Sequence, residues 1–125
     1  MRGKMEKTLN ISMWQKRLED FAKERDWDQF HNPKNLAMAL SVESSELVEI
    51  FQWLSSEQSE NLDEKSLENT THEMADILLY LIRLSSKLNI DLEDALEKKF
   101  EINKSKYPVE LARGTAKKYS ELKSE

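Results

Sequence analysis

The chain has 125 residues, of which 34% are charged, with two glycines, two prolines and no cysteine. A single domain is expected at this length, and so few turn-forming residues argue against sandwiches, barrels and glycine-rich nucleotide loops. The lack of cysteine excludes disulfides and cysteine-ligated zinc, and the net charge of −5 argues against binding to a nucleic acid polymer. No apolar run approaches the ~20 residues of a membrane span, and no signal peptide is recognisable, so a cytoplasmic location is expected.

Helical periodicity dominates the sequence and predicts an all-α, four-helix bundle-like fold. Residues 1–10 are polar and are expected to form a flexible N-terminus. A first helix is predicted over 12–25, because apolar residues recur there at helical spacing. Ser12 and Gln15 resemble a capping box at its start.

The second and third predicted helices are the longest. Asn32 is placed to cap a helix over 33–54, whose first residue is a proline. The polar stretch 55–61 is interpreted as a hairpin loop before a helix that begins near Asn61 or Asp63 and continues to about Leu88. Because the connection is short, the two helices should be antiparallel neighbours. Their wide apolar faces suggest that a second subunit supplies part of the core.

The last predicted helix is followed by a polar tail. Asp91 can cap a helix over 92–106, and Pro108 stops it. We therefore expect one domain over 11–108. Residues 109–125 contain few apolar side chains and are expected to form a mobile tail or a strap across a partner.

Acidic residues without nearby countercharges mark the two long helices. Glu43, Glu46 and Glu49 are the only charges in an otherwise apolar part of the second helix. Glu73 and Asp76 are likewise the only charges in the apolar segment 73–82. Since residues three apart share one side of a helix, antiparallel packing would bring the acid pairs face to face.

Clustered carboxylates in an apolar cleft repel each other, and a divalent cation would relieve that repulsion. Oxygen ligands without histidine or cysteine favour Mg²⁺, with Mn²⁺ as a substitute. The alternative is a solvated acidic face, which is the better interpretation for acid pairs elsewhere in this chain. The apolar flanks favour metal binding for these two pairs.

Aromatic and cationic residues suggest a nucleotide. Trp27 and Trp53 stand at a connector and at a helix end, where a tryptophan can stack on a base or close the edge of the core. His31 could donate to a ligand or act as a local cap. A stripe at spacing four could meet a triphosphate or complement the dipole of its helix, and it comprises Lys99, Asn103 and Tyr107.

The acid pattern resembles the ExxE…ExxD signature of MazG-like all-α nucleoside triphosphate pyrophosphohydrolases. It consists of Glu43-Ser-Ser-Glu46 and, 26 residues later, Glu73-Met-Ala-Asp76. The segments FHNPKN, FQW and NKSKYP follow the same order as in the dCTP pyrophosphatase branch. The resemblance covers about residues 14–120.

The resemblance implies a role for each matching residue. The implied Mg²⁺ ligands are Glu43, Glu46, Glu73 and Asp76. The residues implied around the base are Trp27, Trp53 and Tyr80. The residues implied at the phosphates or the ligand edge are Lys99, Asn103 and Tyr107, and those with a ligand-proximal role are His31 and Lys34. The family also implies homodimers or homotetramers.

The implied reaction is hydrolysis of dCTP or a modified dCTP to the monophosphate and pyrophosphate. Glu46, and after it Glu49, is the candidate general base. Members with a strong dCTP preference tend to carry histidine where Leu18 stands, so strict cytosine selectivity is not expected. The alternatives are another substrate such as dUTP or dATP, and a non-catalytic helical oligomer that binds a partner through its acidic cleft.

Overall fold

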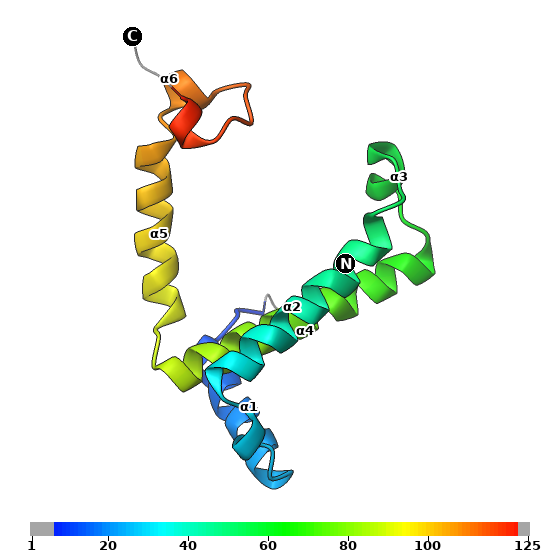
Figure 1. Ribbon diagram of the computed structural model, residues 1–125, viewed down its shortest axis with the longest axis vertical. Coiled ribbons are helices and arrows are strands. Elements are labelled where there is room, and N and C mark those ends of the chain that lie inside the picture. Colours follow the sequence, from blue (N-terminus) through cyan, green and yellow to red (C-terminus); the bar gives the residue numbers. More distant parts are fainter. Residues whose placement is uncertain (1–6, 123–125) are drawn as a thin grey trace. The chain divides into compact units, whose positions relative to one another are not determined.

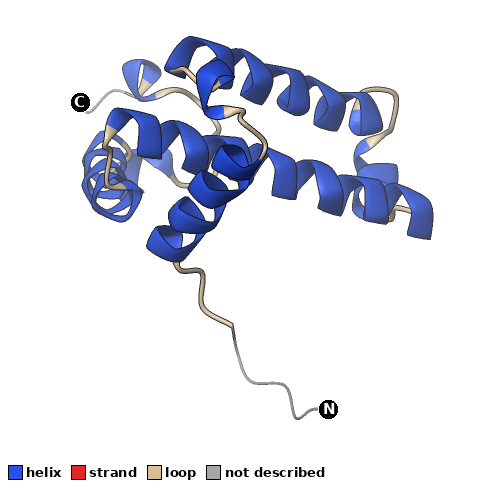
Figure 2. Cartoon of the chain, turned by 90° about the horizontal axis from the view of Figure 1, so that it is seen from below, coloured by secondary structure: helices blue, strands red, loops and turns tan. Residues whose placement is uncertain are grey.

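The computed structural model describes residues 7–122, and all regular secondary structure in this range is helical (Figure 2). The predicted all-α fold class is therefore confirmed. The chain divides after Ile90 into two compact units, each of which is described by itself. None of the helices in the described range is long and apolar enough to cross a membrane. The predicted flexible N-terminus lies mostly outside the described residues, and the predicted domain bounds of 11–108 stay a prediction.

The first unit is built on two long antiparallel helices, α2 and α4, which lie side by side in Figure 1. Most of the contacts between elements join these two helices, and α1 packs on α4. A single 3-10 turn, η1, connects α1 to α2. The elements of this unit are α1 (Ile11–Glu24), η1 (Asp28–Phe30), α2 (Pro33–Phe51), α3 (Ser56–Glu60) and α4 (Glu64–Leu88).

Local capping explains where the long helices begin and end. The Asn32 side chain accepts a hydrogen bond from the Asn35 backbone N–H at 2.8 Å, which confirms the predicted cap of α2. Asp63 caps α4 in the same way, through Ser66 at 2.7 Å. Asn89 ends α4 in the left-handed conformation, which asparagine tolerates better than most residues.

Two local predictions were wrong. Asn10, rather than Ser12, caps α1 by accepting from the Met13 N–H, and Gln15 instead donates to the Ser85 hydroxyl of α4 at 3.1 Å. The expected hairpin loop over 55–61 contains α3, which starts with its own capping box. Both differences arise because a short polar side chain just before a helix satisfies its first N–H groups.

The core of the first unit is small. Within residues 7–122, the fully buried hydrophobic residues are Ala22, Leu36 and Ile82. An exposed apolar stripe with heptad-like spacing runs along α4, and we call it the α4 stripe. Its members are Leu67, Met74, Leu78 and Leu81.

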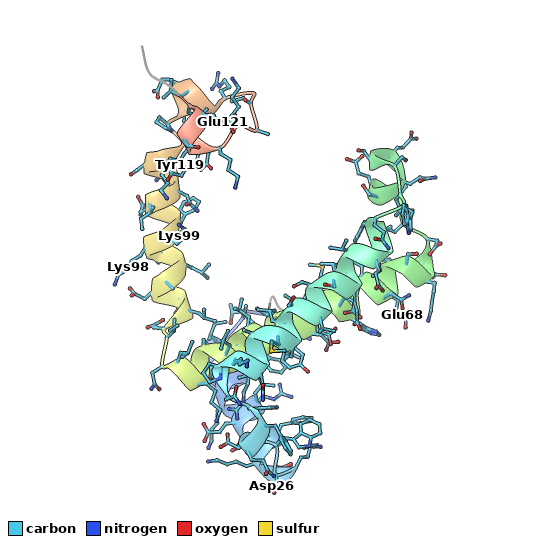
Figure 3. The ribbon with its side chains drawn as sticks, in the orientation of Figure 1. Asp26, Glu68, Lys98, Lys99, Tyr119 and Glu121 are labelled. Atoms are coloured by element: carbon cyan, nitrogen blue, oxygen red, sulfur yellow. The ribbon has the colours of Figure 1, made fainter. Side chains whose placement is uncertain are left out.

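The second unit consists of α5 (Leu92–Lys106), α6 (Val109–Ala112) and η2 (Tyr119–Glu121). Asp91 caps α5, as predicted. In the described part of the predicted tail, Tyr119 folds back toward the end of α5 (Figure 3), and the mobile tail or strap across a partner stays a prediction. The Tyr119 backbone N–H donates to the Tyr107 hydroxyl at 3.3 Å, and Lys106 lies over the Tyr119 ring at 4.4 Å.

Candidate active site

Three carboxylates from α2 and α4 meet where the two helices face each other. One oxygen each from Glu43, Glu73 and Asp76 lies within 4.8 Å of the other two. The spacing of three in Glu73–Asp76 puts both on one side of α4, and antiparallel packing brings Glu43 opposite them. We call these residues the acid cluster. They are three of the four predicted metal ligands.

Two oxygens of the acid cluster lack a hydrogen-bond partner within residues 7–122. Glu43 Oε2 and Glu73 Oε2 are buried, and no partner in the described range of the chain reaches either atom. The pKa of Glu43 is raised to about 7. The largest cause is a side-chain hydrogen bond with Glu73, followed by one with Glu46, and burial and repulsion from these two carboxylates raise the pKa further. Buried carboxylate oxygens without donors need a proton or a cation. The cluster therefore fits a divalent metal, whose oxygen-only ligands suit a hard cation.

The two candidate bases lie beside the cluster on α2. Glu46 is exposed and close enough to Glu43 to raise its pKa, yet its oxygens are not part of the acid cluster. Glu49 is exposed one helical turn further on. Glu46 as a metal ligand and Glu46 or Glu49 as the base stay predictions.

A cavity of about 390 Å³ opens next to the acid cluster. Glu43 and Asp76 are its acidic lining residues, and the rest of its wall is mainly aromatic and apolar. Trp27, His31 and Tyr80, which were predicted near the ligand, all line it. The lining consists of Leu18, Phe21, Trp27, His31, Glu43, Asp76, Leu79, Tyr80 and Arg83.

A polar network ties the connector between α1 and α2 to α4. The buried Arg83 donates through Nη2 to Asp28 at 2.7 Å and through Nε to His31 Nδ1 at 3.1 Å. Lys87 also donates to Asp28, at 2.6 Å, and these cations hold the pKa of the Asp28 carboxyl below its usual value. Burial, and then the nearby positive charges of Arg83 and Lys87, lowers the pKa of His31.

Asp28 and Arg83 were not among the predicted site residues. Arg83 directly follows the apolar segment and is the first cation after Glu73, and this was the available signal. Its partners are 52 and 55 residues away in the sequence, so periodicity could not reveal them.

The other predicted ligand residues are exposed. Lys34 is exposed, and Trp53 is 87% exposed just after the end of α2. Lys99, Asn103 and Tyr107 belong to the second unit, where all three are exposed, and Figure 3 labels Lys99 on α5. Their roles toward a ligand stay predictions.

Comparison with known proteins places this geometry in a family. Residues 38–122, which include the acid cluster, match the MazG-like family. The chain belongs to the MazG-like family. This confirms the resemblance drawn from the acid spacing, and the paired acids of α2 and α4 lie within the MazG-like match.

Several relatives of this MazG-like chain have known names. It is 42% identical to mouse dCTP pyrophosphatase 1 and 40% identical to the human protein of that name, in each case over 105 residues. These matches cover 82% of this chain and 62% of each relative, so the chain spans about three fifths of their length. A crystal structure of a pyrophosphatase from Archaeoglobus fulgidus is 36% identical, with a TM-score of 0.74, and the match covers 84% of this chain and 99% of that one.

Proposed function

We propose that this MazG-like protein is a Mg²⁺-dependent nucleoside triphosphate pyrophosphohydrolase, acting on dCTP or a modified dCTP. The observation that carries the proposal is the acid cluster, with two buried oxygens that lack a partner within residues 7–122, beside an aromatic cavity. The names of the relatives, dCTP pyrophosphatase 1 and a pyrophosphatase, support the same reaction.

The chain offers separate groups for the two ends of a nucleotide. Glu43, Glu73 and Asp76 would hold Mg²⁺, and Glu46 is proposed as a fourth ligand or as the base. Trp27 and Tyr80 form a wall against which a base can pack. For the triphosphate and the ligand edge we propose the residues Lys34, Trp53, Lys99, Asn103 and Tyr107.

The reaction adds water at the α-phosphorus. When bound, Mg²⁺ would neutralise negative charge on the phosphates and polarise the α-phosphoryl group. The water oxygen forms a bond to the α-phosphorus as the bond to the bridging oxygen of the β-phosphate breaks, so a nucleoside monophosphate and pyrophosphate are released. Glu46 accepts the proton of the water, and the exposed Glu49 is the second candidate.

We also propose that the protein self-associates as a homodimer or homotetramer in the cytoplasm. The support is the α4 stripe, in which Met74 is 59% exposed and Leu67 55% exposed. An exposed apolar stripe of this kind commonly marks a protein interface.

The experiment is a panel of nucleoside triphosphates with Mg²⁺, assayed for monophosphate and pyrophosphate together. We expect turnover with dCTP, and a loss of at least about a hundredfold in Asp76→Asn or Glu46→Gln while each variant stays folded. Glu68→Gln is the matched control, since Glu68 is an exposed acid on the same helix (Figure 3). Full activity in Asp76→Asn would contradict the proposal.

The same panel decides between substrates. Leu18 lines the cavity and cannot hydrogen-bond a base, so strict cytosine selectivity is not expected, and dUTP and dATP are included in the panel as alternative substrates. If no nucleotide is hydrolysed, and neither Mg²⁺ nor nucleotide raises the melting temperature, the protein is instead a non-catalytic helical oligomer.

A further inference from the structure

Arg83 fixes the tautomer of the His31 ring, which lines the cavity. An arginine side chain has only donors, so its Nε–H bond to His31 Nδ1 requires a lone pair on that nitrogen. The proton of the neutral ring is therefore on Nε2. Asp28 holds the other end of the guanidinium at 2.7 Å, which keeps Arg83 in this orientation.

His31 Nε2 is available to donate a hydrogen bond to a ligand in the cavity. Within residues 7–122, the only side-chain hydrogen bond to the His31 ring is the one at Nδ1, and the ring lines the cavity. The residue stands on the aromatic side of that cavity, because its ring centre lies 6.3 Å from that of Trp27. Trp27 in turn packs edge-on against Phe21 at 5.6 Å.

The lining residues of the cavity differ in the ligand chemistry that they accept. Glu43 and Asp76 lie close together, and a cation and phosphates would lie beside them. Leu18, Phe21 and Leu79 form an apolar wall that offers no hydrogen bond to a base. His31 Nε2–H is then a neutral donor beside this apolar wall, and the other neutral donors of the lining are the Tyr80 hydroxyl and the Trp27 indole N–H.

We propose that His31 is a specificity-determining residue that donates from Nε2 to a carbonyl oxygen of the nucleobase, and that Arg83 is the positioning residue that sets this tautomer. The inference rests on the proposed function. It predicts a preference for bases that carry a carbonyl group, such as cytosine and uracil, over adenine, which has none.

The first test measures the tautomer without a nucleotide. The ¹⁵N shifts of the two ring nitrogens of His31 should show a protonated Nε2 and an unprotonated Nδ1 in the wild type. Arg83→Met should raise the population with a protonated Nδ1, whereas Arg17→Met, at an exposed arginine of α1 stacked on Trp14, should leave the tautomer populations unchanged. An unchanged tautomer in a folded Arg83→Met protein, or a protonated Nδ1 in the wild type, would overturn the positioning role.

The second test does not depend on replacing the buried arginine. Glutamine can place its amide N–H near the position of Nε2, whereas asparagine is too short. His31→Asn should lower kcat/KM by about five- to tenfold with dCTP and with dUTP but leave dATP little changed, and His31→Gln should retain most activity.

Two results would overturn the base contact. An equal loss of kcat/KM with all three nucleotides would mean that His31 contacts a part of the nucleotide that all three share, not the base. Equal effects of His31→Gln and His31→Asn on kcat/KM would mean that the Nε2 donor has no role. Absence of turnover with every nucleotide would overturn the proposed function and the base contact with it. The NMR measurement would still decide whether Arg83 sets the tautomer.

Discussion

The carboxyl of Glu43 predicts how the stability of the metal-free protein depends on pH. Its pKa in the folded protein is about 7, against an ordinary value of 4.5, so the folded state holds this proton more tightly than the unfolded state. The stabilising contribution is complete below about pH 4.5 and is lost as the pH rises through 7. Thermal melts in a chelator should therefore show that the wild type loses stability between pH 5.5 and 8.

The Glu43→Gln variant isolates this contribution from those of other groups. A glutamine does not titrate, so the variant should lose less stability than the wild type over the same pH range. Parallel stability profiles for the two proteins would contradict the raised pKa.

Trp53 tests a role taken from the family resemblance. Its side chain is 87% exposed, so Trp53→Ala should leave the free energy of unfolding nearly unchanged. If the indole stacks on the base in both ground and transition states, the variant should raise KM about tenfold with little change in kcat. Steady-state kinetics with the best nucleotide measure both quantities. A KM equal to that of the wild type would remove Trp53 from the ligand site.

At the scale of elements, the sequence predicted what depends on local interactions. The caps Asn32 and Asp91 and the breaker Pro108 act within a few residues, and α2, α4 and α5 lie close to their predicted bounds. Asn10 and the capping box of α3 are equally local. They were missed because Ser12 offered a competing start for α1 and because the polar stretch 55–61 was interpreted as a loop.

Contacts between elements were only partly predictable. The acid cluster could be expected, because spacing of three and antiparallel packing suffice to bring Glu73 and Asp76 to Glu43. The Arg83 network could not, because it depends on how the η1 connector lies against α4. The cavity wall likewise combines side chains of α1, the connector and both long helices, and no single periodicity describes such a surface.

For the whole molecule, the small core of the first unit predicts an oligomer. The exposed Met74 and Leu78 on the α4 stripe would be buried in a subunit interface, where a carboxylate is costly. Sedimentation should show a dimer or tetramer for the wild type and a smaller species for Met74→Glu. Lys16→Glu, at an exposed position of α1, should keep the wild-type mass. A monomeric wild type at micromolar concentration would contradict the proposed self-association.

The most direct test is whether the acid cluster binds a divalent cation. Mn²⁺ prefers similar oxygen ligands to Mg²⁺, and its binding can be followed by EPR as the signal of the free ion decreases. We predict that the wild type and Glu68→Gln bind Mn²⁺, and that Glu43→Gln, Glu73→Gln and Asp76→Asn each weaken binding by at least about tenfold. Equal Mn²⁺ affinity in the wild type and these three variants would contradict the assignment of the cluster as the metal site.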